Sequence, residues 1–339
     1  MTRLTPLRRP PRWIVGALLL GATPVLSGAQ GRIAAPSGPS QIARADALLK
    51  AGRVEAAEAL YYREARRRPR DPAARLALGR YLASRGATRI GAVLIEEARF
   101  FGASPALAAL HLAPLYARLG DYKALALLPA APLSAGERTR AEWLAKNPPT
   151  VVGPDSATVA MTMPEADSTL LLGSMTIVID GESVVAEIDP AVRGLMLDTS
   201  RAQGPSVRVF TSAPAAVQAG SPALSAVLLR ARVGTFAFTN LPVSLAPLAS
   251  PGRARIGLDL LGRFSPTFHP ADGRLVLRRS GKVARLLPGE RVPLLVEPRD
   301  AWVVWEGRPE PLSGSLITRR LRAARWTLDA RRGEIILQS

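Results

Sequence analysis

The sequence contains no cysteine among its 339 residues and only two histidines, His111 and His269, which lie far apart. The absence of cysteine excludes disulfides, thiolate metal sites, iron–sulfur clusters and a cysteine nucleophile. Two isolated histidines disfavour a two-histidine zinc site, and we expect neither a metal nor a cofactor. Carboxylate chemistry therefore remains as the main enzymatic option.

Aromatic residues make up only 5% of the chain, and only four of the 45 basic residues are lysine. Hydrophobic residues at 47% and charged residues at 21% indicate a folded protein with room for two domains. The net charge of +18 suggests an anionic partner. The low aromatic content and the compartment inferred below argue against a nucleic-acid partner. The excess of Arg over Lys, with abundant Ala and Pro, fits a GC-rich bacterial genome.

The N-terminus has the pattern of a secretory signal peptide. Residues 1–12 carry four arginines and no acid, residues 13–26 form an apolar run, and the small residues Ser27-Gly28-Ala29 follow. The apolar run is shorter than the about 20 residues that span a membrane. We therefore expect a signal peptide over 1–29 and a periplasmic or extracellular mature protein without a stable transmembrane span. The alternative is an uncleaved anchor.

After a linker over 30–40, residues 41–147 are rich in Ala, Leu and Arg with apolar residues at helical spacing. Glycines recur with a period of 34, and large and small residues recur at fixed distances from them. This periodicity predicts pairs of helices, with the glycine opening the turn and the small residue allowing close helix packing. The recurring residues are Gly52, Ala57 and Tyr61, then Gly86, Gly91 and Ile95, then Gly120.

This pattern resembles the tetratricopeptide repeat, which implies an α-solenoid that binds peptides or packs against other domains without performing chemistry. The third repeat departs from the pattern, because Leu125 replaces the small residue and prolines interrupt the second helix. Ser134 and Glu137 form a predicted capping box for a last helix over 135–146. A generic helical bundle with accidental spacing is the alternative.

After a second linker over 148–158, Val, Thr, Gly and Pro increase. Strands are predicted over 173–180 and 183–188, and a hairpin over 226–248 turns at Gly234. Many short strands with Gly and Pro turns predict a small barrel or sandwich. The fold class is thus multidomain α + β, with a helical N-terminal part and a mainly β C-terminal part.

Two motifs in this β region carry chemistry. An apolar run over 195–197 leads into Asp198-Thr199, and the segment 256–264, IGLDLLGRF, joins an apolar residue and a Gly to a short helix. The order resembles the retropepsin-like aspartic protease domain, over residues 159–280. The resemblance implies that Asp198 is the catalytic carboxylate and Thr199 its supporting hydroxyl. It also implies that Ser200, Ile256 and Gly257 support the cleft and its loops.

The resemblance further implies a dimer. Aspartic proteases need two carboxylates that share one proton, so that one activates water and the other polarises the scissile carbonyl. A single domain supplies only one aspartate, and a homodimer through the β domain would supply its partner. An active dimer would leave Asp198 in an open cleft, with a flap from about 226–240.

The active-site motif departs from the family pattern. Ser200 stands where the family has Gly, which adds a Cβ at a crowded turn, and Arg201, if near, would keep Asp198 ionised. Three interpretations remain open: an active dimeric peptidase, a non-catalytic descendant that keeps the fold, and a generic β-barrel. Asp259 is interpreted as structural, His269 as a partly exposed strand residue and His111 as a packing residue.

A C-terminal β extension over 281–339 contains a sequence pattern similar to that of the preceding hairpin. Residues 328–337 resemble residues 268–277 at an offset of 60, both as strand–turn–strand patterns. The likeness is either accidental or the sign of a reduced second lobe that covers the first. A lobe that pairs with the first would block dimerisation and argue against proteolysis.

These expectations give two main functions. The first is a secreted aspartic-protease-like hydrolase with helical repeats that bind a peptide or protein. The alternative is an inactive scaffold that mediates protein–protein interactions in the cell envelope. A third, weaker possibility is an envelope-surface binder attracted to anionic lipid or polysaccharide, because residues 30–150 hold 19 basic and 10 acidic residues.

Overall fold

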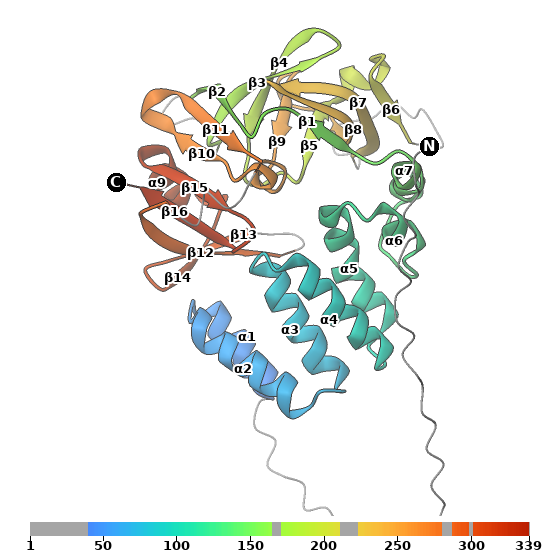
Figure 1. Cartoon of the computed structure of the whole chain (residues 1–339), viewed down its shortest axis with the longest axis vertical. Helices are drawn as coiled ribbons and strands as arrows, with labels where there is room; N and C mark the ends of the chain where they lie inside the picture. The colour runs from blue at the N-terminus through green and yellow to red at the C-terminus, as the bar shows by residue number, and fades with distance from the viewer. Residues whose placement is uncertain (1–39, 165–170, 211–222, 280–286, 298–300, 339) are drawn as a thin grey trace, which may run out of the picture. The chain divides into compact units, whose positions relative to one another are not determined.

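A computed structural model describes residues 40–164, 171–210, 223–279, 287–297 and 301–338 (Figure 1). The predicted signal peptide and nearly all of the first linker lie outside the described residues. None of the described helices is both long and apolar enough to cross a bilayer.

The predicted division into a helical part followed by a β-rich part is confirmed (Figure 1). The helices of the first part are Gln41–Lys50 (α1), Val54–Arg67 (α2), Pro72–Ser84 (α3), Thr88–Phe100 (α4), Pro105–Leu119 (α5), Tyr122–Leu127 (α6) and Ala135–Lys146 (α7).

Local sequence explains where these helices begin and end. Asp71 caps α3 by accepting a hydrogen bond from the Ala73 N–H at 2.8 Å, and proline at the first position of α3 and of α5 preorganises the backbone. The predicted capping box of Ser134 and Glu137 begins α7. Helix α6 has only six residues, because the chain reaches the proline-rich segment that follows.

The periodic glycines lie in the turns after α1, α3 and α5. Gly52, Gly86 and Gly120 have φ of 75°, 82° and 74°, a region that disfavours residues with a Cβ. The small residues set the packing of α3 on α4, since a Cβ on Gly91 would lie 2.7 Å from the Gly79 carbonyl oxygen. Sequence spacing therefore reflects real turns and close helix contacts.

The β-rich part contains sixteen strands among the described residues. They are Thr150–Val152 (β1), Ser156–Thr162 (β2), Gly173–Ile179 (β3), Glu182–Ile188 (β4), Leu195–Asp198 (β5), Val207–Val209 (β6), Leu224–Val233 (β7), Phe236–Ala246 (β8), Ala254–Ile256 (β9), Thr267–His269 (β10), Arg274–Arg278 (β11), Glu290–Val296 (β12), Ala301–Trp305 (β13), Arg308–Pro311 (β14), Arg325–Asp329 (β15) and Glu334–Gln338 (β16). Two short helices, Leu258–Leu261 (α8) and Ser315–Ala323 (α9), interrupt the strands.

Six of these strands close into a barrel in the order β3-β4-β9-β5-β8-β7, because β7 also pairs with β3. Strand β5 lies between β8, to which it is parallel, and β9, to which it is antiparallel. Alternate residues of β3 point inward and are buried, as Met175, Ile177 and Ile179 show. The barrel core is therefore filled by aliphatic side chains.

The C-terminal strands extend the sheet beyond the barrel. Strand β10 pairs with β11 on one side and with β15 on the other, and the order continues through β16, β12, β13 and β14 (Figure 1). The C-terminal extension therefore pairs with β10, in the preceding β region of the same chain. Phe268 of β10 stacks on Trp326 of β15 with ring centroids 3.9 Å apart.

The helical and β-rich parts contact each other within one compact unit that spans Pro39–Ser339. The Arg85 guanidinium donates to the backbone oxygens of Leu294 and Gly333, at 3.2 and 2.6 Å. A Cβ on Gly52 would lie 2.2 Å from the Gly307 oxygen, and one on Gly86 would lie 2.3 Å from the Ala330 oxygen. Two of the repeat glycines thus also permit the C-terminal strands to pack on the helices.

Candidate functional site

Asp198 is the last residue of β5, and the barrel topology determines what covers it. Because β5 lies between β8 and β9, the connection over 247–253 must cross the end of β5. In register, Asp198 pairs with Ala246 of β8, and the Asp198 N–H donates to the Arg253 oxygen at 3.2 Å. The connection therefore encloses the aspartate, whose exposed fraction is 5%.

The Asp198 carboxylate is held by hydrogen-bond donors from two loops. Its Oδ1 accepts from the Ser200 N–H and its Oδ2 from the Leu248 N–H, both at 3.0 Å. Burial raises the pKa of Asp198, but hydrogen bonds from the Ser200 hydroxyl and from the backbone of Leu248, Ser200 and Gly252 outweigh burial. Together they lower the pKa to about 2.

This environment determines which chemistry Asp198 can perform. A carboxylate with a pKa of about 2 is ionised at every physiological pH. An aspartic protease dyad instead needs two adjacent carboxyl groups, one of which stays protonated because the two charges repel each other. Among the described residues, the groups hydrogen-bonded to Asp198 are N–H and O–H donors. Within this chain the described residues around Asp198 stabilise an anion, and the second carboxyl group of a dyad would have to come from another copy.

The residues after Asp198 form a short 3₁₀ helix, Thr199–Gln203, that Asp198 caps. Thr199 is half-buried and Ser200 is exposed. The expected crowding at Ser200 is absent, since the residue is exposed and its φ is not in the left-handed region. The Arg201 guanidinium pairs with Glu182 at 2.6 Å, and the groups that lower the pKa of Asp198 include Ser200, Leu248 and Gly252.

Ile256 and Gly257 lie at the other end of β5. Ile256 pairs with Leu195, three residues or roughly 10 Å from Asp198 along the strand. A Cβ on Gly257 would lie 2.1 Å from the Val192 oxygen, so this glycine permits close packing of the loop before β5. The structure therefore places these two residues at the end of β5 opposite to Asp198, and their support of a cleft stays a prediction.

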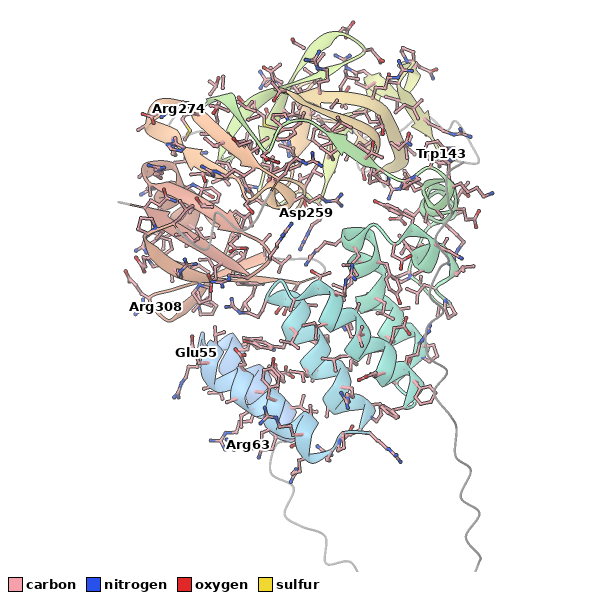
Figure 2. All side chains as sticks on the ribbon, in the orientation of Figure 1. Glu55, Arg63, Trp143, Asp259, Arg274 and Arg308 are labelled. Atoms are coloured by element: carbon pink, nitrogen blue, oxygen red, sulfur yellow. The ribbon has the colours of Figure 1, made fainter. Side chains whose placement is uncertain are left out.

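Asp259 and the β7–β8 hairpin, the predicted flap, both make contacts that hold neighbouring elements together. Asp259, labelled in Figure 2, accepts a hydrogen bond from the Gly194 N–H at 2.8 Å and thereby ties α8 to the same loop. The β7–β8 hairpin turns at Gly234, against Val159 of β2, whereas Asp198 pairs at the opposite end of β8. The turn of this hairpin is therefore not a flap over Asp198, and that expectation is wrong.

The remaining sequence-predicted residues lie in the helical part, apart from His269 in β10. Ala57, Tyr61 and Ile95 are buried, and the Tyr61 hydroxyl donates to Asp46 Oδ1 at 2.5 Å. His269 in β10 is half-buried, with its Nδ1 3.5 Å from Asp272. These positions agree with roles in packing rather than in catalysis.

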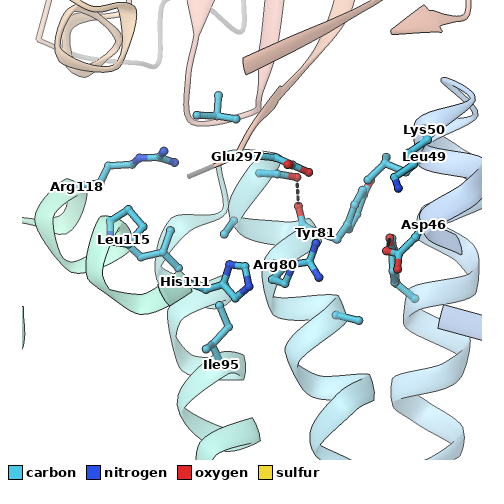
Figure 3. A pocket seen from close by; sticks show the side chains of 16 residues that line it. Asp46, Leu49, Lys50, Arg80, Tyr81, Ile95, His111, Leu115, Arg118 and Glu297 are labelled. Atoms are coloured by element: carbon cyan, nitrogen blue, oxygen red, sulfur yellow. Dashed lines mark hydrogen bonds between the residues drawn. The ribbon is translucent and has the colours of Figure 1, made fainter. Parts of the chain in front are cut away.

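Helices α1, α3 and α5 line a cavity of about 190 Å³, shown in Figure 3. Its charged residues include Lys50, Arg80 and Arg118, and Val296 and Glu297 at the end of β12 also line it. Sequence reasoning missed these residues and interpreted His111, which also lines the cavity, as packing alone. The 34-residue period could have found them, because Lys50, Ser84 and Arg118 occupy equivalent repeat positions.

Comparison with known proteins gives structural likenesses without a sequence match. No family profile and no curated protein sequence matches this chain. A crystal structure of a retropepsin-like aspartic protease from Rickettsia conorii is similar over 38% of this chain and 91% of that chain, with 17% sequence identity and a TM-score of 0.26.

Proposed function

We propose that this chain is a retropepsin-like protein without peptidase activity, whose helical repeats bind a peptide or protein ligand. The observation that carries this proposal is the buried, ionised state of Asp198. The residue is only 5% exposed, and its carboxylate accepts hydrogen bonds from two loops and has a pKa of about 2. A carboxylate in that state serves as an anchor for backbone N–H groups rather than as half of a proton-sharing dyad.

The pairing of β10 with β15 supports the same conclusion. A homodimeric peptidase needs a free edge at which a second copy can add its strands. Here the edge of β10 is occupied by the chain's own C-terminal extension, through Thr267 opposite Thr327 and Phe268 opposite Trp326. A second copy would have to displace β15 before it could approach through this edge.

The contacts across this edge have approximate two-fold symmetry at the sequence offset of 60. The Thr267 and Thr327 hydroxyls lie 2.8 Å apart, and both side chains are fully buried. Arg278 donates to Thr267 at 2.5 Å, and Gln338, 60 residues later, donates to Thr327 at 3.0 Å. Helix, strand, turn and strand occur in the same order on both sides. This symmetry favours a reduced second lobe over an accidental hairpin likeness.

The helical part then remains as the region for ligand binding. Its α4 exposes the apolar side chains of Ile90, Val93 and Phe100, which suits recognition of another chain rather than catalysis. The N-terminal pattern of basic, apolar and small residues supports secretion to the periplasm or beyond. Sequencing of the N-terminus of the protein purified from its own host tests this localisation, with cleavage after residue 29 expected and an intact N-terminus as the contrary result.

A cleavage assay tests the absence of peptidase activity. Wild type and Asp198→Asn are incubated with a denatured protein mixture at acidic and neutral pH, and new N-termini are identified by mass spectrometry. We expect no chain-dependent cleavage from either protein. Cleavage by wild type that Asp198→Asn abolishes would instead establish the active dimeric peptidase.

Selection from a random peptide library against the full chain tests ligand binding. We expect enriched peptides whose binding is weakened by Val93→Glu, at a 54% exposed position of α4 outside the cavity, and unchanged by Val185→Glu, at a 41% exposed position of β4. Equal effects of the two substitutions, in variants with native helix content, would contradict a ligand site in the helical part.

A further inference from the structure

A segment from the other half of the chain forms part of the wall of the cavity in the helical part. Its walls come from α1, α3 and α5, and the end of β12 contributes Val296 and Glu297 (Figure 3). Its volume of about 190 Å³ is somewhat larger than an engineered cavity of about 150 Å³ that holds benzene. The space therefore suits a small molecule rather than an extended peptide.

Part of the wall is apolar and aromatic. Tyr61 and Tyr81 stack with ring centroids 5.2 Å apart, and Leu115 and Val296 also line the cavity. Both tyrosine hydroxyls are engaged, because Tyr61 donates to Asp46 and Tyr81 donates to Glu58 at 2.7 Å. Both rings are themselves buried, so the apolar surface open to a ligand comes from the half-buried Leu49, Pro114 and Val296.

The other part of the wall is charged, with Lys50, Arg80 and Arg118 against the carboxylates of Asp46 and Glu297, of which Asp46 accepts the hydrogen bond of Tyr61. Figure 3 shows Arg118 extending from α5 and Arg80 from α3, with His111 between them. In the described part of the chain, no hydrogen bond or ion pair joins Arg80 or Arg118 to an acceptor. Arg118 is half-buried, so its five N–H donors have partly lost water without gaining a protein partner.

The surroundings of Arg118 do not neutralise it. Burial and the nearby charges of Arg193 and Arg263 lower the pKa of Arg118, and the attraction of Asp259 opposes them. Asp259 already accepts a hydrogen bond from the Gly194 N–H. Burial and Arg80 lower the pKa of His111 to about 4, so its imidazole is neutral and adds a hydrogen-bonding group without charge.

We propose that this cavity binds a small organic carboxylate with an apolar body about the size of a benzene ring. Arg80 and Arg118 bind the carboxylate oxygens, because a planar guanidinium matches a carboxylate with two parallel hydrogen bonds. The half-buried side chains of Leu49, Pro114 and Val296 contact the apolar body. This site goes beyond the proposed function, since it takes a free small molecule and not a peptide.

Isothermal titration calorimetry on the full chain tests the proposal with four probes. These are phenylacetate, its neutral isostere phenylacetamide, inorganic phosphate, and a tripeptide that ends in phenylalanine. We expect saturable binding of phenylacetate and at least tenfold weaker binding of the other three, because each lacks the charge, the apolar body or the small size. Absence of phenylacetate binding, or equal binding of the amide, would overturn the proposal, and preference for the tripeptide would overturn the assignment to a small ligand.

Substitutions locate the site. Arg80→Gln and Arg118→Gln are each expected to weaken phenylacetate binding about tenfold or more, as the loss of a charged hydrogen bond predicts. Arg89→Gln, an exposed arginine on α4 that does not line the cavity, is the matched control and should bind as wild type. Arg80 is itself exposed, so its replacement tests the site even if Arg118→Gln destabilises the fold. Equal binding by all three variants would contradict the location. Each result is independent of the cleavage assay and the peptide selection.

Discussion

Replacement of Asp198 by asparagine should destabilise the protein, whereas replacement of a catalytic carboxylate is expected to be neutral or stabilising. Active sites keep charged groups in unfavourable positions for function, so their loss commonly increases stability. Asp198 instead receives N–H and O–H donors, and an asparagine NH₂ group would face the Leu248 N–H at the present Oδ2 position. The sign of the change in the free energy of unfolding therefore distinguishes a structural carboxylate from a catalytic one.

The magnitude follows from the pKa of Asp198. Its fall from an ordinary 3.8 to about 2 corresponds to about 2 kcal/mol of stability. Because the folded pKa lies below the unfolded one, this contribution is fully present above about pH 5 and is lost as pH falls from about 4 towards 2. About half of it should remain at pH 3.

Urea unfolding of wild type and Asp198→Asn at pH 7 and at pH 3 measures this difference. We expect a loss of about 2 kcal/mol or more at pH 7, which lowers the thermal midpoint by roughly 4 °C, and a smaller loss at pH 3. Asp272→Asn, at an exposed carboxylate, is the control and should leave the free energy of unfolding nearly unchanged. An Asp198→Asn variant as stable as wild type at pH 7 would refute the reasoning.

Three further predictions concern the C-terminal extension and the loop before β5. Thr267→Val should cost about 1–3 kcal/mol in urea unfolding, because it leaves Arg278 and the Thr327 hydroxyl without their buried partner. The double variant with Thr327→Val should cost less than the sum of the single variants, and strict additivity would show that the two hydroxyls do not interact. Gly257→Ala should cost about 1–3 kcal/mol or more, since its Cβ would overlap the Val192 oxygen, whereas Gly204→Ala, with its nearest neighbour at 3.2 Å, should cost less. Light scattering of the full-length mature chain at micromolar concentration should give the mass of one copy, because β15 occupies the edge of β10; a dimer that persists on dilution would contradict this.

Periodicity and turn chemistry predicted much of the fold. The glycine spacing of 34 located the turns after α1, α3 and α5, and Ser134 with Glu137 located the start of α7. Asp180-Gly181, Gly234 and Asp272-Gly273 marked the turns of three hairpins. These features depend on residues close together in the sequence, so local rules suffice for them.

The order of strands could not be predicted in the same way, because it depends on contacts between distant segments. The placement of β5 between β8 and β9 brings the 247–253 connection over Asp198, and no local pattern in that connection indicates it. The likeness at an offset of 60 was visible in the sequence. Only the pairing of Thr267 with Thr327 showed that the two hairpins meet.

For the candidate site, too, local sequence patterns predicted one part, and contacts between distant segments determined the other. The apolar run into Asp198 marked a strand end, but the state of its carboxylate depends on Leu248 and Gly252, about fifty residues away. The ion pair of Arg201 with Glu182, on β4, also joins residues that no local pattern links. The charged residues of the helical cavity were missed because charged residues on helices are usually solvated, although Lys50, Ser84 and Arg118 recur with a spacing of 34 residues.

The titration of Asp198 tests the central claim most directly. The side-chain carboxyl ¹³C resonance of Asp198, assigned by its absence in Asp198→Asn, is followed from pH 7 downwards in the wild-type chain. The carboxylate that we describe should titrate in a single step with a pKa of about 2, or remain ionised until the protein unfolds in acid. A titration in two steps, or a pKa near or above 4, would show a proton shared with a second carboxyl group and would contradict a non-catalytic role for Asp198.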